Sequence, residues 1–566
     1  MEELRGLLET VRIAYFSMEI GLEEKIPTYS GGLGVLAGDT IKSCADLDVP
    51  IVAITLLNEK GYFLQELDNE GNQTEFPVDW RKEDFLNLLP VKASVNIEGR
   101  TVKIQAWEFI VKGIKDGKVP IYFLDTNIPE NSEYDQSLTS FLYGGDLKYR
   151  LCQEIVLGIG GVRMLEALGY KNIEKYHMNE GHASLLAVEL LERTRNEGIA
   201  DASKKYNIDE VKNKCIFTTH TPVPAGHDKF PIELVRGVLQ SDLPFARPDI
   251  FLSGSEMNMT LLALNLSKYI NGVAKKHGEV SREMFPGYSI DSITNGIHLC
   301  SWVSPYFKSL YDKYIPEWKA DYFSLRYALS IPKDQIWQAH YDTKRELIDY
   351  VNSRTNIGMD YEVFTIGFAR RATSYKRADL LLSDANRLIE INDKVGQIQI
   401  VYAGKAHPRD NGGKELIKRI FSKIKELKPK VKIVYLENYD MELGKLITSG
   451  SDLWLNTPLK PQEASGTSGM KACLNGVPNL SVLDGWWIEG CIENVTGWAI
   501  GSLNRESADS NQDVYDMYQK LEKVVIPMFY NEKDKWLEIM RHTIALNASF
   551  FNTQRMVQEY VLNAYL

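Results

Sequence analysis

Cysteine and histidine are scarce in this sequence, and neither is arranged in a pattern that binds metal. The chain has six cysteines and nine histidines, and no Cys-x-x-Cys spacing of the kind found in many zinc and redox sites occurs. His177 and His182 stand five residues apart, a spacing that on a helix turns two side chains away from each other. We therefore predict no metal site. Reduced, structural thiols are expected at Cys44, Cys152, Cys215, Cys300, Cys473 and Cys491.

Long apolar runs and an excess of positive charge are also missing. No stretch of about 18 uncharged apolar residues could span a membrane, and the acidic first nine residues lack the apolar core of a signal peptide. With 65 basic and 76 acidic residues, the net charge of −11 argues against a polyanionic partner. These absences favour a cytoplasmic enzyme with no nucleic-acid partner and no membrane partner.

The pattern of secondary structure predicts an α/β fold. Short β-rich runs alternate with helical stretches, as expected for parallel sheets. A long helix is predicted over residues 147–168. Strands are predicted at residues 13–16, 50–55 and 215–219 in the first half, and at 363–369, 398–403, 431–436 and 453–456 in the second.

A chain of 566 residues is too long for one ordinary hydrophobic core. We place a domain change at the turn-rich residues 294–297, which separates the two strand series. This predicts a Rossmann-like domain over residues 1–294, a second one over 295–540, and a C-terminal helix over 541–566 that packs back on the first domain. Two such doubly wound domains would face each other across a cleft, with ligands at the carboxyl ends of their strands.

Three motifs carry residues suited to phosphate and sugar chemistry. The first is the glycine-rich turn Tyr29-Ser-Gly-Gly-Leu-Gly34. Its glycines let the backbone approach an anion or a sugar hydroxyl, and a helix is expected to begin directly after it. A tight turn that only packs a helix on a sheet explains this motif about as well.

The second motif is a basic cluster that contains Arg370, Arg371, Lys376 and Arg377. It follows the predicted strand at residues 363–369, where a cleft ligand is expected. Arginine offers a fork for two phosphate oxygens, and lysine offers a compact charge. Almost no acids accompany these cations, which favours a phosphate site over a solvated helix start.

The third motif is the segment Glu463-Ala-Ser-Gly-Thr-Ser-Gly-Met-Lys471. It combines a carboxylate, small residues that expose backbone N–H groups, and a single lysine on the following helix. Such a helix start can bind a cofactor phosphate while the lysine reaches an aldehyde. Taken alone, a capped helix with an exposed lysine is the commoner explanation.

Together and in this order, the three motifs resemble those of the α-glucan phosphorylases of the glycogen, starch and maltodextrin group. The resemblance extends from about residue 13 to about residue 485 and is greatest to the short bacterial and archaeal type. It implies a GT-B type fold and a homo-oligomer. The chain begins almost at its first predicted strand, so the N-terminal regulation of the long enzymes is not expected.

The resemblance also implies a role for each matching residue. Pyridoxal 5'-phosphate would be held as a Schiff base on Lys471. Arg371 and Lys376 would bind the substrate and cofactor phosphates, and His220 would lie beside the glucosyl unit, although a structural strand-end histidine explains His220 equally well. The other implied cofactor contacts are Arg370, Thr467, Ser468, Trp302 and Tyr439, of which the aromatic pair also suits an ordinary core. The implied substrate contacts are Gly31, Gly32, Glu180, Asn295, Glu463, Ala464, Ser465 and Gly466.

The sequence departs from the long enzymes at three of these motif positions. Asp440 stands where they place an arginine against the cofactor phosphate, Thr373 stands where a histidine is usual, and Glu180 replaces an aspartate. These departures bear on phosphate affinity and fine specificity, while the reaction class stays as the resemblance implies.

The implied reaction is reversible phosphorolysis of a terminal α-1,4-glucosyl bond, which yields α-glucose 1-phosphate with retained configuration. No carboxylate pair for an ordinary retaining mechanism is evident. The resemblance implies instead that the cofactor phosphate passes a proton to the substrate phosphate, which then captures the sugar. Two alternatives stay open: a nucleotide-sugar glycosyltransferase such as a glycogen synthase, which needs no Schiff-base lysine, and a glucan-binding protein without activity.

Overall fold

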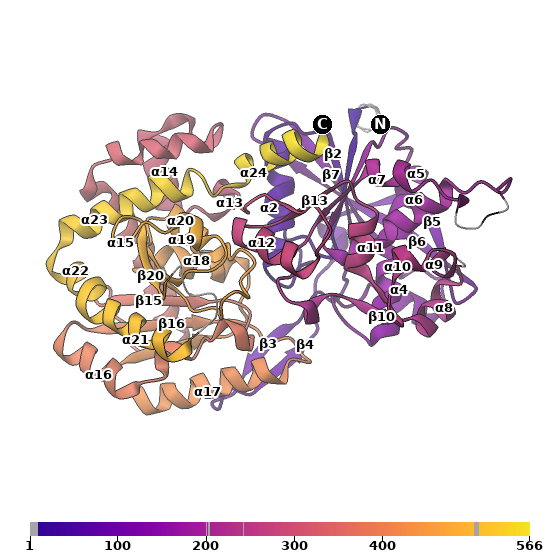
Figure 1. The fold of residues 1–566 in the computed structure, drawn as a ribbon. Coiled ribbons are helices and arrows are strands. Elements are labelled where there is room, and N and C mark those ends of the chain that lie inside the picture. Colours follow the sequence, from indigo (N-terminus) through magenta and orange to yellow (C-terminus); the bar gives the residue numbers. More distant parts are fainter. Residues whose placement is uncertain (1–9, 200, 202–203, 242, 429, 503–508) are drawn as a thin grey trace.

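The computed structural model describes residues 10–199, 201, 204–241, 243–428, 430–502 and 509–566. Residues 1–9, for which the sequence predicts no signal peptide, lie outside the described part. Figure 1 shows two sheet-containing halves side by side, the first in indigo to magenta and the second in pink to yellow. The prediction of an α/β fold with parallel sheets is confirmed.

The first half contains a nine-stranded sheet. Seven of its strands are parallel, and β6 and β5 extend one edge in antiparallel fashion. In spatial order the strands are β14 (Asp291–Ser292), β13 (Tyr269–Gly272), β9 (Cys215–Thr218), β8 (Lys175–Asn179), β1 (Ile13–Phe16), β2 (Ile51–Leu56), β7 (Lys118–Asp125), β6 (Arg100–Lys112) and β5 (Asn87–Ile97).

The predicted elements of this half are present close to their expected bounds. The strands predicted at residues 13–16, 50–55 and 215–219 are β1, β2 and β9. The predicted long helix is continuous as α4 (Leu147–Ile155), a π-helical segment (Val156–Gly160) and α5 (Gly161–Leu168). The antiparallel edge was not predicted, because β5 and β6 alternate between buried and exposed residues and lack the continuous apolar pattern of the central strands.

The second half contains a six-stranded sheet whose pairs are all parallel. Numbered along the chain, its strands lie in the order 3-2-1-4-5-6, which is the order of the Rossmann fold. The four strands predicted here are β15 to β18. In spatial order the strands are β17 (Lys432–Leu436), β16 (Ile398–Ala403), β15 (Phe364–Ala369), β18 (Leu453–Asn456), β19 (Asn479–Val482) and β20 (Gly497–Ile500).

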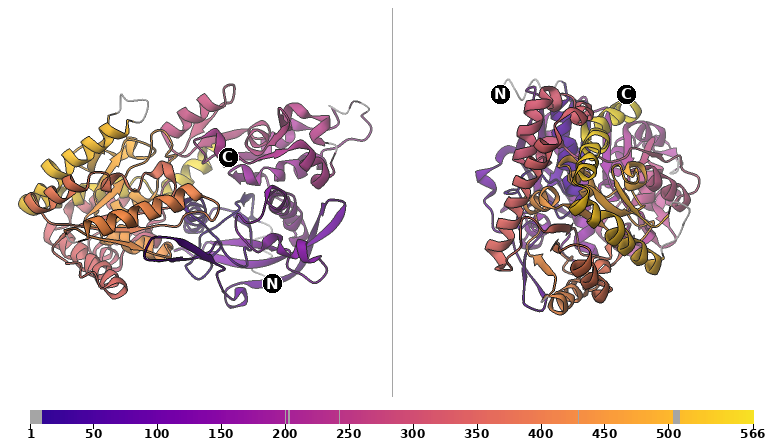
Figure 2. Two further views of the ribbon diagram at one scale, coloured as in Figure 1. Left: turned by 90° about the horizontal axis from the view of Figure 1, so that it is seen from below. Right: turned by 90° about the vertical axis from the view of Figure 1, so that its left-hand side faces the viewer.

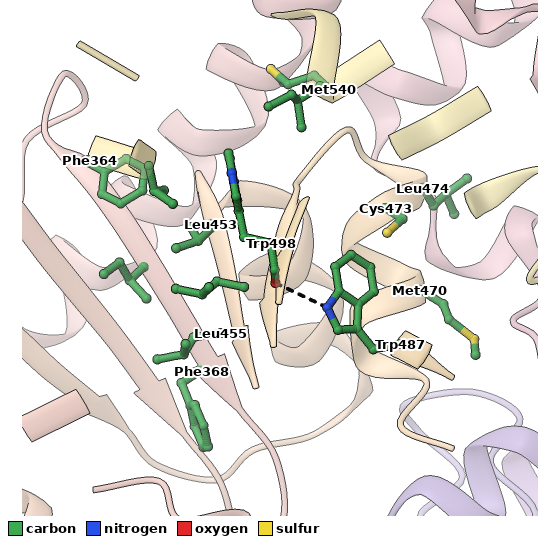
Figure 3. Packing of buried hydrophobic residues seen from close by; sticks show 14 of the residues in the cluster. Phe364, Phe368, Leu453, Leu455, Met470, Cys473, Leu474, Trp487, Trp498 and Met540 are labelled. Carbon is green, nitrogen blue, oxygen red and sulfur yellow. Dashed lines mark hydrogen bonds between the residues drawn. The ribbon is translucent and has the colours of Figure 1, made fainter. Parts of the chain in front are cut away.

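The core of the second half fixes the short helix α19 (Ser468–Leu474) against this sheet. Trp487 Nε1 donates a hydrogen bond to the carbonyl of Trp498 at 3.3 Å, drawn as a dashed line in Figure 3. Burial of these large side chains is the main contribution to the stability of this region. Around the two tryptophans, Figure 3 shows Phe364, Phe368, Leu453, Leu455, Met470, Cys473, Leu474 and Met540.

Two segments cross between the halves. The strands β3 (Leu64–Leu67) and β4 (Gln73–Phe76) form an arm that reaches the second half near α17 (Asn411–Leu427) (Figures 1 and 2). Gln65 Nε2 on this arm donates to the carbonyl of Gly404 at 3.0 Å. At the other end of the chain, α24 (Thr553–Tyr560) packs on α2 (Gly32–Asp46) of the first half. The hydroxyl of Tyr565 then bonds to His177 Nδ1 at 2.8 Å.

The described residues contain no helix with the length and apolar character to cross a membrane. They also contain no group of three or more His, Cys, Asp or Glu side chains placed to hold a metal ion. All six cysteines are free, and four of them are buried.

Candidate active site

The candidate residues follow the carboxyl ends of the central strands of both sheets. Glu180 follows β8 and His220 follows β9 in the first sheet, and Arg370 follows β15 in the second. Along the chain, each sheet first grows toward one edge and then toward the other. The change lies between β1 and β8 in the first sheet and between β15 and β18 in the second. Such a point is where open α/β sheets bind ligands.

A buried group of one acid and two bases lies at the end of the second sheet. Glu463 lies in the loop between β18 and α19, and its Oε2 accepts hydrogen bonds from Lys376 Nζ and from Arg370 Nη2, the latter at 3.2 Å. Burial opposes ionisation of Glu463, but the two cations outweigh it and hold its pKa below the ordinary value. Burial, assisted by the charge of Arg370, lowers the pKa of Lys376 to about 8. Glu463 thus compensates part of the charge of the two buried cations, and Asp484 also attracts the charge of Lys376.

Several polar atoms around this group are buried without a hydrogen-bond partner in the described part of the chain. They are Nε and Nη1 of Arg370, Oγ1 of Thr373 and Oγ of Ser465. A buried donor without a partner costs about 1–3 kcal/mol, so such atoms signal a ligand that completes their bonding. Guanidinium donors and hydroxyls beside an excess positive charge fit the oxygens of a phosphate.

Lys471 on α19 has the environment of a reactive amine. Its Nζ lies 3.3 Å from the centroid of the Trp302 ring, and no ion pair to it is present among the described residues. Burial lowers the pKa of Lys471 to about 8, against the opposing charge of Asp39. A neutral amine at such a pH can condense with an aldehyde. The side chain of Thr467, the N-cap residue of α19, makes no capping hydrogen bond, and Ser468 Oγ accepts a hydrogen bond from the indole Nε1 of Trp454 at 3.2 Å.

The glycine turn is built around Glu19, a residue that the sequence analysis missed. Its buried carboxylate accepts hydrogen bonds from Ser30 N at 2.5 Å, from Gly31 N at 3.3 Å and from the hydroxyl of Tyr143 at 2.8 Å. A Cβ on Gly34 would lie 2.7 Å from Glu19 Oε2, so the carboxylate requires glycine there. A Cβ on Gly31 or Gly32 would meet no atom within 4 Å. The outer side of the turn is therefore open to a ligand.

The substitution Glu19→Gln is expected to loosen this turn. The amide NH₂ of glutamine would face backbone N–H groups whose hydrogen bonds the carboxylate now accepts. We therefore expect the free energy of unfolding to fall by about 1–3 kcal/mol. Binding of inorganic phosphate should weaken, because we expect the open side of this turn to position such an anion. Urea unfolding and calorimetric titration with phosphate measure the two effects. Glu23→Gln, at an exposed position nearby, is the matched control, and unchanged stability and phosphate affinity in Glu19→Gln would contradict the role.

Glu180 and His220 form a second group in the first half. Glu180 has a positive φ of 81°, and its Oε2 accepts from His220 N at 2.7 Å and from Thr221 Oγ1 at 2.9 Å. The carboxylate thus organises the His220 loop. Asn179 Oδ1 bonds to His220 Nε2 at 2.7 Å, and burial holds the pKa of His220 well below its ordinary value, so the ring is neutral. Asn295 Oδ1 is buried without a partner among the described residues.

The remaining candidates have more varied settings. Arg371 is exposed. Its positive charge acts to lower the pKa values of Tyr62 and His407, and its side chain forms no ion pair with Glu463 in the described part of the chain. Tyr439 lies beside Arg370, and burial raises its pKa to about 12. Asp440 caps the helix α18 (Met441–Gly450), since its Oδ1 accepts from Leu443 N at 2.8 Å. This gives Asp440 a local structural role at the position where the long enzymes have an arginine.

A further missed residue is Asp484, which supports the Glu463 loop. Its Oδ2 accepts from Glu463 N at 2.8 Å, and its Oδ1 accepts from Gly485 N at 2.9 Å. Burial raises the pKa of Asp484 to about 7. A usable sequence signal existed for Glu19 and Asp484, because each follows a buried strand within three residues.

Comparison with known proteins agrees with this chemistry. The family model described as carbohydrate phosphorylase matches residues 245–497. The maltodextrin phosphorylase of Thermococcus litoralis is 40% identical, over 98% of this chain and 70% of its own length. The glycogen phosphorylase of Aquifex aeolicus is 35% identical, over 98% of this chain and 86% of its own. An uncharacterized protein of Methanocaldococcus jannaschii is 32% identical, over 98% of this chain and 99% of its own length. The chain belongs to the carbohydrate phosphorylase family.

Proposed function

We propose that this protein is an α-1,4-glucan phosphorylase that reversibly converts the terminal glucosyl unit of a glucan and inorganic phosphate into α-glucose 1-phosphate, with retained configuration. The observation that carries the proposal is the buried group of Arg370, Lys376 and Glu463, whose unpartnered donors fit phosphate oxygens. Relatives named maltodextrin phosphorylase and glycogen phosphorylase support the same reaction class.

Pyridoxal 5'-phosphate is the proposed cofactor, and the residues present fit it. Lys471 would hold its aldehyde carbon through the amine, over the ring of Trp302. Arg370, Lys376, Thr467 and Ser468 are the proposed contacts to its phosphate, with Tyr439 beside Arg370. When bound, the cofactor supplies an acidic phosphate next to the substrate phosphate.

The protein residues then bind, orient and compensate charge. Lys376 and Arg371 are proposed to bind the substrate phosphate, whose negative charge both cations stabilise, buried Lys376 more strongly than exposed Arg371. Glu463, Ala464, Ser465 and Gly466 would contact the glucosyl hydroxyls. The further proposed sugar contacts are Gly31, Gly32, Glu180, His220 and Asn295. His220, held neutral by burial, would donate or accept a hydrogen bond without carrying charge.

The arrangement of the whole chain is part of the same proposal. Domains over residues 1–294 and 295–540 would form a GT-B type pair that faces across a cleft, with residues 541–566 returning to the first domain. The packing of α24 on α2 supports this last point. We further propose a cytoplasmic homo-oligomer that binds no nucleic acid and no membrane.

Release of glucose 1-phosphate from maltodextrin and phosphate, with and without borohydride reduction, tests the function. Reduction should fix pyridoxal phosphate to Lys471, and the reduced enzyme should keep activity because the imine is not used in the chemistry. Purified protein that carries no pyridoxal phosphate and forms no glucose 1-phosphate when supplied with it would overturn the proposal. Incorporation of glucose from a nucleotide sugar would favour a glycosyltransferase, and maltodextrin binding without turnover would favour a glucan-binding protein.

Cofactor loading should depend on pH with a midpoint near the lowered pKa of Lys471. Below this pH the amine is protonated and has no lone pair for the aldehyde, and above it the neutral amine reacts. The rate of reconstitution of cofactor-free protein with pyridoxal phosphate should therefore rise with pH through about 8, far below the ordinary lysine value of 10.5. Stopped-flow absorbance measures this rate. A midpoint near that ordinary value would contradict the buried setting of Lys471, and Lys471→Arg should give no covalent product.

A further inference from the structure

The arm formed by β3 and β4 brings two glutamine side chains, Gln65 and Gln73, from the first half onto the second (Figure 1). Gln65 is only 1% exposed. The two side-chain amides are joined, because Gln65 Nε2 donates a hydrogen bond to Gln73 Oε1 at 2.8 Å. Neither glutamine is a proposed ligand contact, so the proposed chemistry leaves this buried polar pair unexplained.

The glutamine pair binds the backbone of the loop that follows β16. Gln65 Nε2 donates to the carbonyl of Gly404 at 3.0 Å. Gln73 Nε2 donates to the carbonyl of Ala406 at 2.8 Å, and Gln73 Oε1 accepts a hydrogen bond from Ala406 N at 3.0 Å. These backbone groups lie beyond the end of the strand, where the ladder no longer supplies partners. The two side-chain amides take the place of those partners.

Gln65 also binds the loop that follows β17. Its Oε1 accepts a hydrogen bond from Asn438 N at 2.9 Å, and its backbone N donates to Asn438 Oδ1 at 3.3 Å. Asn438 directly precedes Tyr439, a proposed cofactor contact. One buried side chain from the first half thus joins the loops of two neighbouring strands in the second.

The loop after β16 lies directly behind the basic residues of the proposed phosphate site. Arg370 N and Ala372 N donate to the carbonyls on either side of Gly404, at 3.1 Å and 2.9 Å. A Cβ on Gly404 would lie 2.1 Å from the carbonyl oxygen of Arg370, so the two loops touch without room for a side chain. Arg371 stands between the two bonded residues, and its backbone therefore follows any displacement of this loop.

Other contacts dock the arm without reaching these loops. Lys414 Nζ on α17 pairs with Glu75 Oε1 at 2.6 Å. At the arm's turn, a Cβ on Gly71 would lie 2.7 Å from the ring of Phe421, so this turn packs closely on α17. The arm is thus already held by α17. The glutamine pair adds directional hydrogen bonds whose targets are the loops behind the phosphate site.

We propose that Gln65 and Gln73 are positioning residues for the phosphate site: they hold the loops after β16 and β17 so that Arg370 and Arg371 keep the geometry that binds phosphate. The assignment of these arginines to phosphate rests on the proposed function. The first half of the chain therefore contributes to a phosphate site on the second half without touching the ligand. Small displacements of binding groups lower affinity and rate strongly, which is why such support matters.

The test uses Gln65→Met in the full chain, a substitution that keeps the length of the side chain, removes its amide and adds no charge. Calorimetric titration should show inorganic phosphate binding about tenfold more weakly, the factor expected from a lost hydrogen bond. The KM for phosphate should rise while the KM for maltodextrin changes little. Thr74→Val, at an exposed position on the same arm, is the matched control and should change neither. Thermal unfolding confirms folding, and Gln73→Met repeats the measurements if Gln65→Met does not fold.

Amide hydrogen exchange of the full chain without ligand separates positioning from simple docking. In Gln65→Met, peptides that cover residues 369–376 and 437–440 should exchange faster, while peptides of α17 keep the parent rate. Unchanged exchange over residues 369–376, or faster exchange with unchanged phosphate affinity, would overturn the proposal. If the parent protein forms no glucose 1-phosphate, the proposed function fails, while hydrogen exchange and the phosphate titration still decide the role of the two glutamines.

Discussion

Lys471→Ala is expected to lose bound pyridoxal phosphate and to release glucose 1-phosphate at less than about one-thousandth of the parent rate. Burial lowers the pKa of both Lys471 and Lys376 to about 8, but Lys376 is paired with Glu463, so Lys471 is the candidate whose amine is available for attachment of an aldehyde near neutral pH. The side chain is buried against Trp302, so its truncation also opens space in the cofactor pocket. The fold should persist, because Met470, Cys473 and Leu474 continue to anchor α19 (Figure 3).

Absorbance of the bound cofactor and peptide mass after borohydride reduction measure the first effect, and coupled glucose 1-phosphate release measures the second. Lys471→Arg preserves the charge but forms no imine, so it separates electrostatic from covalent roles. Lys445→Ala, at a partly buried lysine on α18, is the control. Stoichiometric covalent cofactor in Lys471→Ala would show that the attachment site lies elsewhere.

Lys376→Ala is expected to lower kcat by about 10²–10³-fold, since it removes one of the two cations that compensate phosphate charge in a water-poor site. It also leaves buried Glu463 with Arg370 alone, and the pKa of Glu463 should then rise because burial is less opposed. We expect the free energy of unfolding to fall by about 1–3 kcal/mol. Lys425→Ala, an exposed lysine on α17, should change neither quantity.

The double variant Lys376→Ala with Glu463→Gln distinguishes the two consequences. Removing the acid as well relieves the uncompensated buried charge, so part of the lost stability should return. Activity should not return, because Glu463 is itself a proposed sugar contact. Recovery of activity together with stability would mean that Lys376 acts only on folding.

The sequence determined those parts of this protein whose signals are local. The apolar runs that became β1, β2, β9 and β15 to β18 could be predicted because a strand covered on both faces is apolar along its whole length. The candidate residues at their ends, among them Arg370 and Lys376, followed from the rule that parallel sheets bind ligands at that edge. The roles of Lys471 and Glu463 came from a resemblance between three motifs and a known family.

Only the tertiary structure decided which charges meet and which backbone groups they hold. Glu19 is drawn to the Gly31 turn by backbone donors eleven and twelve residues away, and Asp39 meets Trp302 across 263 residues of sequence. The antiparallel edge β5–β6 was likewise hidden, because its half-exposed strands carry no continuous apolar run. A single carboxylate on a buried helix leaves no pattern in the sequence that identifies its hydrogen-bond partner. Burial sets its chemistry, and burial is a property of the folded chain.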